Sequence, residues 1–192
     1  RFIQKDIVLS SQKKMKISNK RVVTVFNEMG LNAIGAVEYY EKASTINSMD
    51  AIVYNSFGKE IKKIKRSDFK DQSASGDGTM FSDNRVIYLD YTPTEYPFTI
   101  VYESEKTTSN TAFIPFWLPV EDYFVGVEKK ILNVYFSSDL GFRKKEMNFS
   151  KFKIEKTIET PSQLSYQVSN IVAQKKEANS HYFLDFLPKV KF

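Results

Sequence analysis

Apolar and polar side chains alternate with a period of two along much of this chain. In residues 98–105 the first, third and fifth positions are Phe, Ile and Tyr, and the second, fourth and sixth are Thr, Val and Glu. Residues 164–169 alternate Leu, Tyr and Val with Ser and Gln in the same way. This period is typical of antiparallel strands that have one buried and one solvated face. An all-β fold is therefore expected.

Turn-forming residues separate the alternating segments at short intervals. Residues 55–58, Asn-Ser-Phe-Gly, lie between two alternating runs and predict a β-hairpin. Residues 159–162, Glu-Thr-Pro-Ser, predict a second hairpin. About ten short strands punctuated in this way favour an antiparallel β-sandwich. We expect residues 1–192 to form a single domain of this class, as the N-terminal part of a longer chain.

Two kinds of segment depart from strict alternation. Ile61 and Ile64 are three residues apart, which a β-bulge or a strand end explains better than a helix within a hairpin. Residues 33–43 contain helix-forming types, and residues 164–178 have room for a short helical turn. Neither segment combines helix caps with a 3.6-residue apolar stripe. Little helix is therefore expected.

The residue types that are missing exclude several kinds of chemistry. The chain has 192 residues, no cysteine and one histidine, His181. Thiolate metal sites and cysteine nucleophiles are excluded, and a zinc site lacks ligands. We interpret His181 as a surface or packing residue. No catalytic residue, metal site or cofactor is expected, although paired carboxylates, Glu103 with Glu105 or Glu121 with Asp122, leave hydrolysis as an alternative.

The positive charge of the chain is spread evenly. Lys and Arg number 28 against 23 Asp and Glu, which gives a net charge of +5. Acidic residues are interleaved with the lysine clusters, so solvated strand faces and protected sheet edges explain the charge better than nucleic-acid binding. No apolar run approaches the roughly 18 residues of a membrane helix. Neither a nucleic-acid partner nor a membrane span is expected.

Residues 111–119 form the segment with the most unusual composition. It is rich in aromatic residues and contains two prolines, so it cannot be a long central strand. One interpretation is an exposed aromatic platform for a sugar, a peptide or a neighbouring domain. The other is a loop whose rings close one end of the sandwich. The candidate interface or ligand residues are Phe113, Phe116, Trp117 and Tyr123.

A series of short motifs resembles a bacterial family of domains of unknown function. The resemblance is strongest from about residue 48 to residue 119. Its first motif is residues 53–64, Val-Tyr-Asn-Ser-Phe-Gly-Lys-Glu-Ile-Lys-Lys-Ile. The others follow in order at residues 68–71, 82–86, 89–91, 96–100, 102–103 and 110–119. The family is found ahead of transglutaminase-like cores in exported multidomain proteins. The resemblance spans nearly the whole chain.

The resemblance implies a function as well as a fold. It implies a sandwich-like domain, N-terminal to a papain-like Cys-His-Asp core and exported to the periplasm or cell surface. The family supplies no catalytic residues, and residues 186–192 are similar to an exit toward the next domain. We therefore expect a non-catalytic accessory domain that positions the downstream core or its substrate. The alternative is an independent carbohydrate- or peptide-binding module with two or three coplanar exposed aromatic rings around Trp117.

Overall fold

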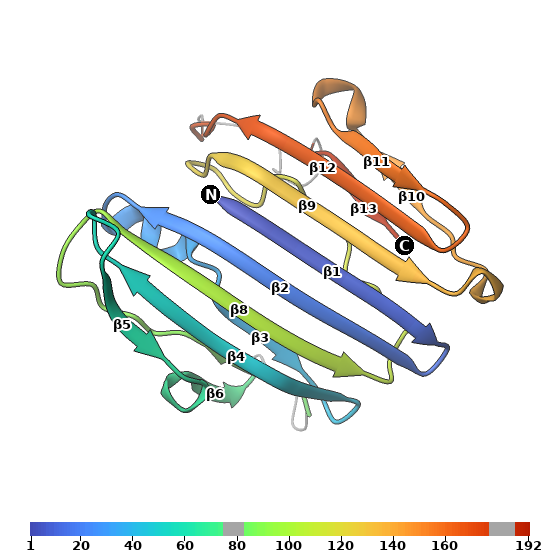
Figure 1. Ribbon diagram of the computed structural model, residues 1–192, viewed down its shortest axis with the longest axis horizontal. Helices are drawn as coiled ribbons and strands as arrows, with labels where there is room; N and C mark the ends of the chain where they lie inside the picture. Colours follow the sequence, from blue (N-terminus) through green and yellow to red (C-terminus); the bar gives the residue numbers. More distant parts are fainter. Residues whose placement is uncertain (75–82, 177–186) are drawn as a thin grey trace.

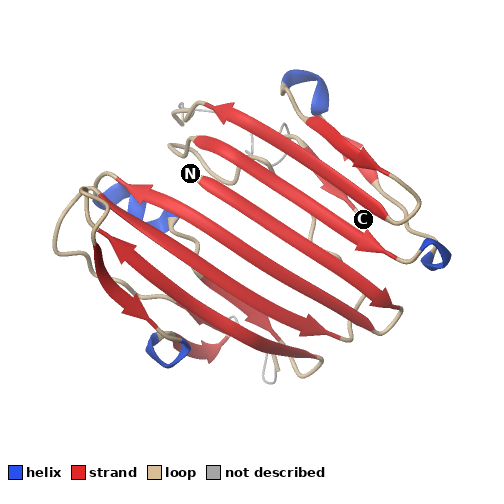
Figure 2. Ribbon diagram, viewed as in Figure 1, coloured by secondary structure: helices blue, strands red, loops and turns tan. Residues whose placement is uncertain are grey.

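The computed structural model describes residues 1–74, 83–176 and 187–192, and His181 lies outside them. Strands dominate this part of the chain (Figure 2). Its helices are short 3₁₀ turns, η1 (Glu28–Ala33), η2 (Arg66–Asp68), η3 (Ser138–Leu140) and η4 (Phe149–Lys151). The expectation of a mostly β chain with little helix is confirmed. Residues 37–40, inside a segment with helix-forming types, form a strand.

The largest element is an eight-stranded sheet with the strand order β11-β12-β9-β1-β2-β8-β4-β5 (Figure 1). Its strands are β1 (Phe2–Ser11), β2 (Lys14–Val25), β4 (Ser44–Tyr54), β5 (Glu60–Ile64), β8 (Phe98–Thr108), β9 (Val127–Phe136), β11 (Glu155–Glu159) and β12 (Gln163–Ile171). Neighbouring strands are antiparallel except for β1 and β9 in the centre, which are parallel. The prediction of a purely antiparallel sheet is therefore wrong at this pair.

Two small sheets cover parts of one face of the main sheet, which we call the inner face. One contains β3 (Val37–Tyr40), β7 (Arg85–Tyr88) and β6 (Lys70–Ser73). The other pairs β10 (Lys145–Met147) with β13 (Lys189–Lys191). Figure 1 shows β3 and β13 behind the main sheet. The main sheet is thus open and partly covered, and the predicted β-sandwich is not confirmed.

The inner face carries two separate hydrophobic clusters. The first joins β2, β4 and β8 to the three-stranded sheet, and its members include Val53, Ile100 and Ile87 of β7. The second joins β1, β9 and β12 to Trp117 and Val190. The outer face is solvated, and cross-strand pairs such as Lys16 with Glu105 lie on it. This arrangement accounts for the period-two pattern of the sequence.

Both predicted hairpins are present. In the first, Val53 pairs with Lys62 and Tyr54 with Glu60, so Ile61 is the extra residue of a β-bulge, as its spacing from Ile64 indicated. The second hairpin joins β11 to β12 around residues 160–162.

The final described stretch is built into the fold. Val190 is fully buried, and its backbone exchanges two hydrogen bonds with Trp117, of 2.9 and 3.0 Å. The resemblance suggested an exit from the domain here. The structure shows that this stretch also closes the second hydrophobic cluster.

Candidate functional site

A band of polar side chains crosses the inner face between the two hydrophobic clusters. On β1, Lys5 stands between the buried Ile3 and Ile7. The strand register places Lys5 opposite Asn19, and Ile3 opposite both Arg21 and Lys130. The band therefore runs across four neighbouring strands. Its members are Lys130 of β9, Lys5 of β1, Asn19 and Arg21 of β2, and Ser104 and Lys106 of β8.

Glu38 of β3 lies over one end of the band. Its side chain is 7% exposed and forms an ion pair with Lys106, with 3.1 Å between Lys106 Nζ and Glu38 Oε2. Asn19 and Ser104 each donate a further hydrogen bond of 2.7 Å to Glu38 Oε1. A buried carboxylate is stable only when its oxygens are satisfied in this way. Glu38 therefore ties the three-stranded sheet to the centre of the main sheet.

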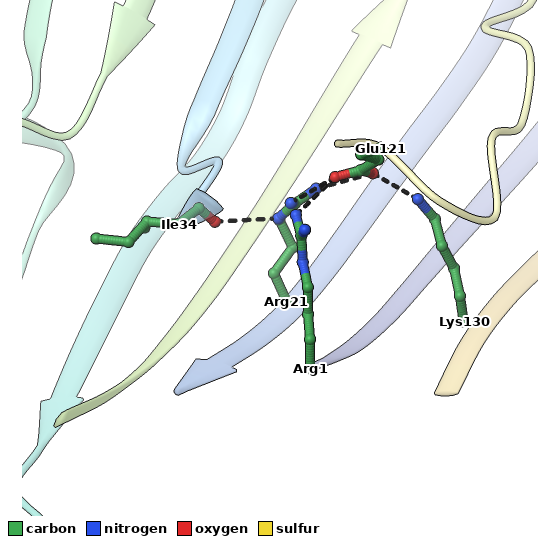
Figure 3. A network of polar contacts seen from close by, with 5 residues as sticks. All are labelled: Arg1, Arg21, Ile34, Glu121 and Lys130. Carbon is green, nitrogen blue, oxygen red and sulfur yellow. Dashed lines mark hydrogen bonds and ion pairs between the residues drawn. The ribbon is translucent and has the colours of Figure 1, made fainter. Parts of the chain in front are cut away.

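Glu121 lies over the other end of the band. It follows the aromatic segment, and side chains from three strands or their ends converge on it (Figure 3). Arg1 Nη2 is 2.6 Å and Arg21 Nη2 is 2.8 Å from Glu121 Oε2. Lys130 donates to Glu121 Oε1. This network holds the loop after Trp117 against the main sheet.

The charges in this network set one another's pKa values. Burial alone would raise the pKa of Glu121, but Lys130 and Arg21 outweigh it and lower the pKa to about 2. Burial lowers the pKa of Lys130 to about 8, against the opposing effect of Glu121. Burial also lowers the pKa of Lys5, although Glu38 and Glu121 act in the opposite direction. The inner face thus carries cations whose burial costs free energy.

The band forms the floor of a cavity of about 470 Å³. Its described lining includes four cations, Lys5, Arg21, Lys106 and Lys130, and the two carboxylates of Glu38 and Glu121. The opposite wall comes from β3 and from residues 115–118. A volume of this size is typical of small-molecule sites.

Exposed aromatic side chains stand at the mouth of the cavity. Phe116 is 53% exposed and Tyr39 is 64% exposed, and both line the cavity. Phe113, 78% exposed, lines an adjoining hollow of about 390 Å³ that shares Tyr39 and Lys106 with the cavity. We call Tyr39, Phe113 and Phe116 the aromatic rim.

The four aromatic residues singled out from the sequence do not form one platform. Trp117 is 2% exposed and stacks on Tyr166 with 5.8 Å between ring centroids, so it belongs to the core. Tyr123 is half-buried. Phe113 and Phe116 are exposed and do not close the fold. The core interpretation is therefore right for Trp117 and wrong for these two residues, and the interface role of the set stays a prediction.

The charged residues of the cavity were not identified as a site from the sequence. The sequence does contain an indication of this site. Lys5, Lys106 and Lys130 each occupy an inward-facing position of an alternating strand, where an apolar residue is expected. Glu121 was considered only as one of a carboxylate pair with Asp122, which is exposed. Glu103 and Glu105, the other pair, bind Lys20 and Lys16 on the outer face.

Among residues 1–74, 83–176 and 187–192, no group of three or more His, Cys, Asp or Glu side chains is placed to hold a metal ion. In the same ranges, no helix has the length and apolar character needed to cross a membrane.

These features define a mostly β protein with an open mixed sheet and a charged cavity on its inner face. A family model, DUF3857, described as a domain of unknown function with a solved structure, matches residues 11–182. The chain therefore belongs to the DUF3857 family, which confirms the resemblance drawn from its motifs. A search of curated protein sequences gives no match.

A solved structure with a similar fold is a crystal structure described as a "putative protease" from Parabacteroides distasonis ATCC 8503. The two are 13% identical, with a TM-score of 0.71. The match covers 98% of this chain and 38% of the Parabacteroides chain. At this identity the likeness shows the fold alone, and this chain spans well under half of that protein.

Proposed function

We propose that this chain is a non-catalytic accessory domain that precedes a transglutaminase-like cysteine core in an exported protein. In this role it positions the core or the substrate of the core. The observation that carries the proposal is the partial overlap with the Parabacteroides protein, in which this fold accounts for 38% of a longer chain described as a "putative protease". The fold of this chain is therefore one part of that longer protein, and the family is one of domains of unknown function. Both facts fit a domain that accompanies a catalytic domain better than they fit the catalytic domain itself.

The aromatic rim supports a role in contacts. Exposed aromatic side chains that gather on one part of a surface mark binding sites more often than isolated ones do. Phe113 and Phe116 lie three residues apart on a segment that is fixed at both ends. Before them Thr111 donates to the carbonyl oxygen of Gln12, and after them Trp117 pairs with Val190. The rim is therefore presented on an anchored loop, which lowers the entropy lost on binding.

The alternative is an independent peptide- or carbohydrate-binding module. The cavity of about 470 Å³ beside the rim favours it. Coplanar exposed rings around Trp117, which the sequence led us to expect for such a module, are absent from the described residues because the Trp117 ring is buried. A binding module of this kind would use Tyr39, Phe113 and Phe116 instead.

The parent gene and the parent protein test the two proposals. The coding sequence beyond Phe192 should contain a Cys, a His and an Asp in papain-like order. In that intact protein, Phe113→Ser with Phe116→Ser should lower the activity of the core, and Phe57→Ser should not. Phe57 is a suitable control because it is 91% exposed in the turn of the β4–β5 hairpin. A coding sequence without such a core, or equal activity in all variants, would contradict the accessory role.

A further inference from the structure

The cations that line the inner cavity differ in whether they form ion pairs with carboxylates. Glu121 is paired with Arg1, Arg21 and Lys130, and Glu38 is paired with Lys106. Lys5 lines the same cavity, yet within the described part of the chain it makes no hydrogen bond and no ion pair. The structure thus leaves one cationic group available on the cavity floor.

Lys5 is a charged residue at an inward-facing position of a central strand. β1 is a central strand, with β9 and β2 hydrogen-bonded on its two sides. The side chain faces inward between Ile3 and Ile7, which are 3% and 0% exposed. A lysine in such a position costs free energy unless something compensates its charge.

Two polar atoms of the cavity-lining residues also lack partners among the described residues. They are the indole N–H of Trp117, on the covering loop, and the hydroxyl of Tyr102, on β8. The Ser104 hydroxyl lies close enough to Tyr102 to act on its pKa, but its proton is donated to Glu38. Buried donors without a partner are rare in folded proteins and often mark the place of a ligand or an ordered water.

We infer that the cavity is a binding site for a carboxylate that is attached to an apolar group. Lys5 binds the carboxylate, and the group that carries it lies against Phe116 and Tyr39 at the mouth. Lys5 is the lining cation that forms no ion pair with a described residue, and one carboxylate is enough to pair with it. A peptide end and a small aromatic acid share this chemistry.

The single tryptophan of the chain gives a direct measurement. Trp117 lines the cavity, so its fluorescence reports on occupancy. We would titrate the protein with N-acetylphenylalanine, and with N-acetylphenylalaninamide as the matched uncharged ligand. The acid should give a saturable change, and the amide should bind at least tenfold more weakly. 3-Phenylpropionate, which lacks the peptide group, distinguishes a peptide end from a simple aromatic acid, and either source satisfies the inference.

Two variants connect the response to Lys5. Lys5→Met should reduce the affinity for the acid at least tenfold, because it removes the ammonium and keeps a side chain of similar length. Lys20→Met is the matched control, since Lys20 is a lysine of the neighbouring strand that faces the outer side and pairs with Glu103. Circular dichroism would verify that both variants are folded.

Several results would overturn the inference. They are an equal response to acid and amide, an undiminished response of the Lys5→Met protein, no saturable response at millimolar acid, or a response to inorganic phosphate that exceeds the response to both acids.

Discussion

A Cβ atom on residue 35 would lie 2.5 Å from Nη2 of Arg21, because Gly35 leaves the space that the guanidinium occupies. From this place Arg21 donates to the carbonyl oxygen of Ile34 at 3.2 Å and to Glu121 at 2.8 Å. Gly35 also has φ +63°, in the left-handed region that favours glycine. Gly35 therefore leaves room for Arg21, and Arg21 connects the segment before β3 and the loop at Glu121 to the main sheet.

Gly35→Ala should lower the free energy of unfolding for two reasons. The left-handed backbone costs about 1–3 kcal/mol with a side chain present, and the new methyl group displaces Arg21 from Glu121. Gly141→Ala is the matched control, because Gly141 has the same φ of +63° with nothing within 4 Å of its Cβ position. Urea unfolding should show a larger loss for Gly35→Ala than for Gly141→Ala. Equal losses would mean that the contact with Arg21 carries no stability.

Trp117→Ala should destabilise the protein by about 3–5 kcal/mol, as expected for a large buried ring. The ring is 2% exposed and stacked on Tyr166, so its removal leaves a cavity in the second hydrophobic cluster. Phe113→Ala, on the same segment but 78% exposed, should change the unfolding free energy by no more than about 0.5 kcal/mol. Thermal and urea unfolding of both variants would test this contrast. A mild effect of Trp117→Ala would contradict the core position.

Glu121→Gln should destabilise the protein by about 2 kcal/mol at neutral pH, since three cations lose a charged partner and the site is partly solvated. The folded-state pKa of Glu121, about 2, lies below its usual 4.5. The stability from its charge is therefore present above about pH 4.5 and is lost as the pH falls toward 2. The difference between wild type and variant should shrink over this range.

Glu103→Gln provides the comparison for that pH series. Glu103 binds Lys20 on the outer face, where both side chains are about half exposed. An exposed ion pair contributes no more than about 1 kcal/mol. A pH-independent effect of Glu121→Gln, or one no larger than that of Glu103→Gln, would contradict the role given to the network.

Much of the fold could be predicted from local pattern. The alternation in residues 98–105 and the turn at residues 55–58 correctly predict a strand and a hairpin, and the spacing of Ile61 and Ile64 indicates the bulge. The parallel pairing of β1 with β9 could not be predicted, because the two strands are far apart in the chain and alternation does not encode the direction of a neighbour. For the same reason the sequence does not show that the strands build one open sheet.

The candidate site was only partly accessible to sequence reasoning. The aromatic residues attract attention because of their type, although burial then separates Trp117 from Phe113 and Phe116. The charged cavity depends on register, which brings Lys5, Arg21 and Lys130 together from three strands. A lysine at an inward position of an alternating run is the signal that would have indicated it.

The most direct test of the account is the free energy of unfolding of Lys5→Met relative to wild type. Burial lowers the pKa of Lys5, so the charged form opposes folding at neutral pH. If Lys5 is kept for binding, its replacement by an apolar side chain of similar length should stabilise the protein by about 1 kcal/mol or more. Lys20→Met should have no such effect. A loss of stability in Lys5→Met would contradict the account, because it would show that Lys5 serves the fold and not a ligand.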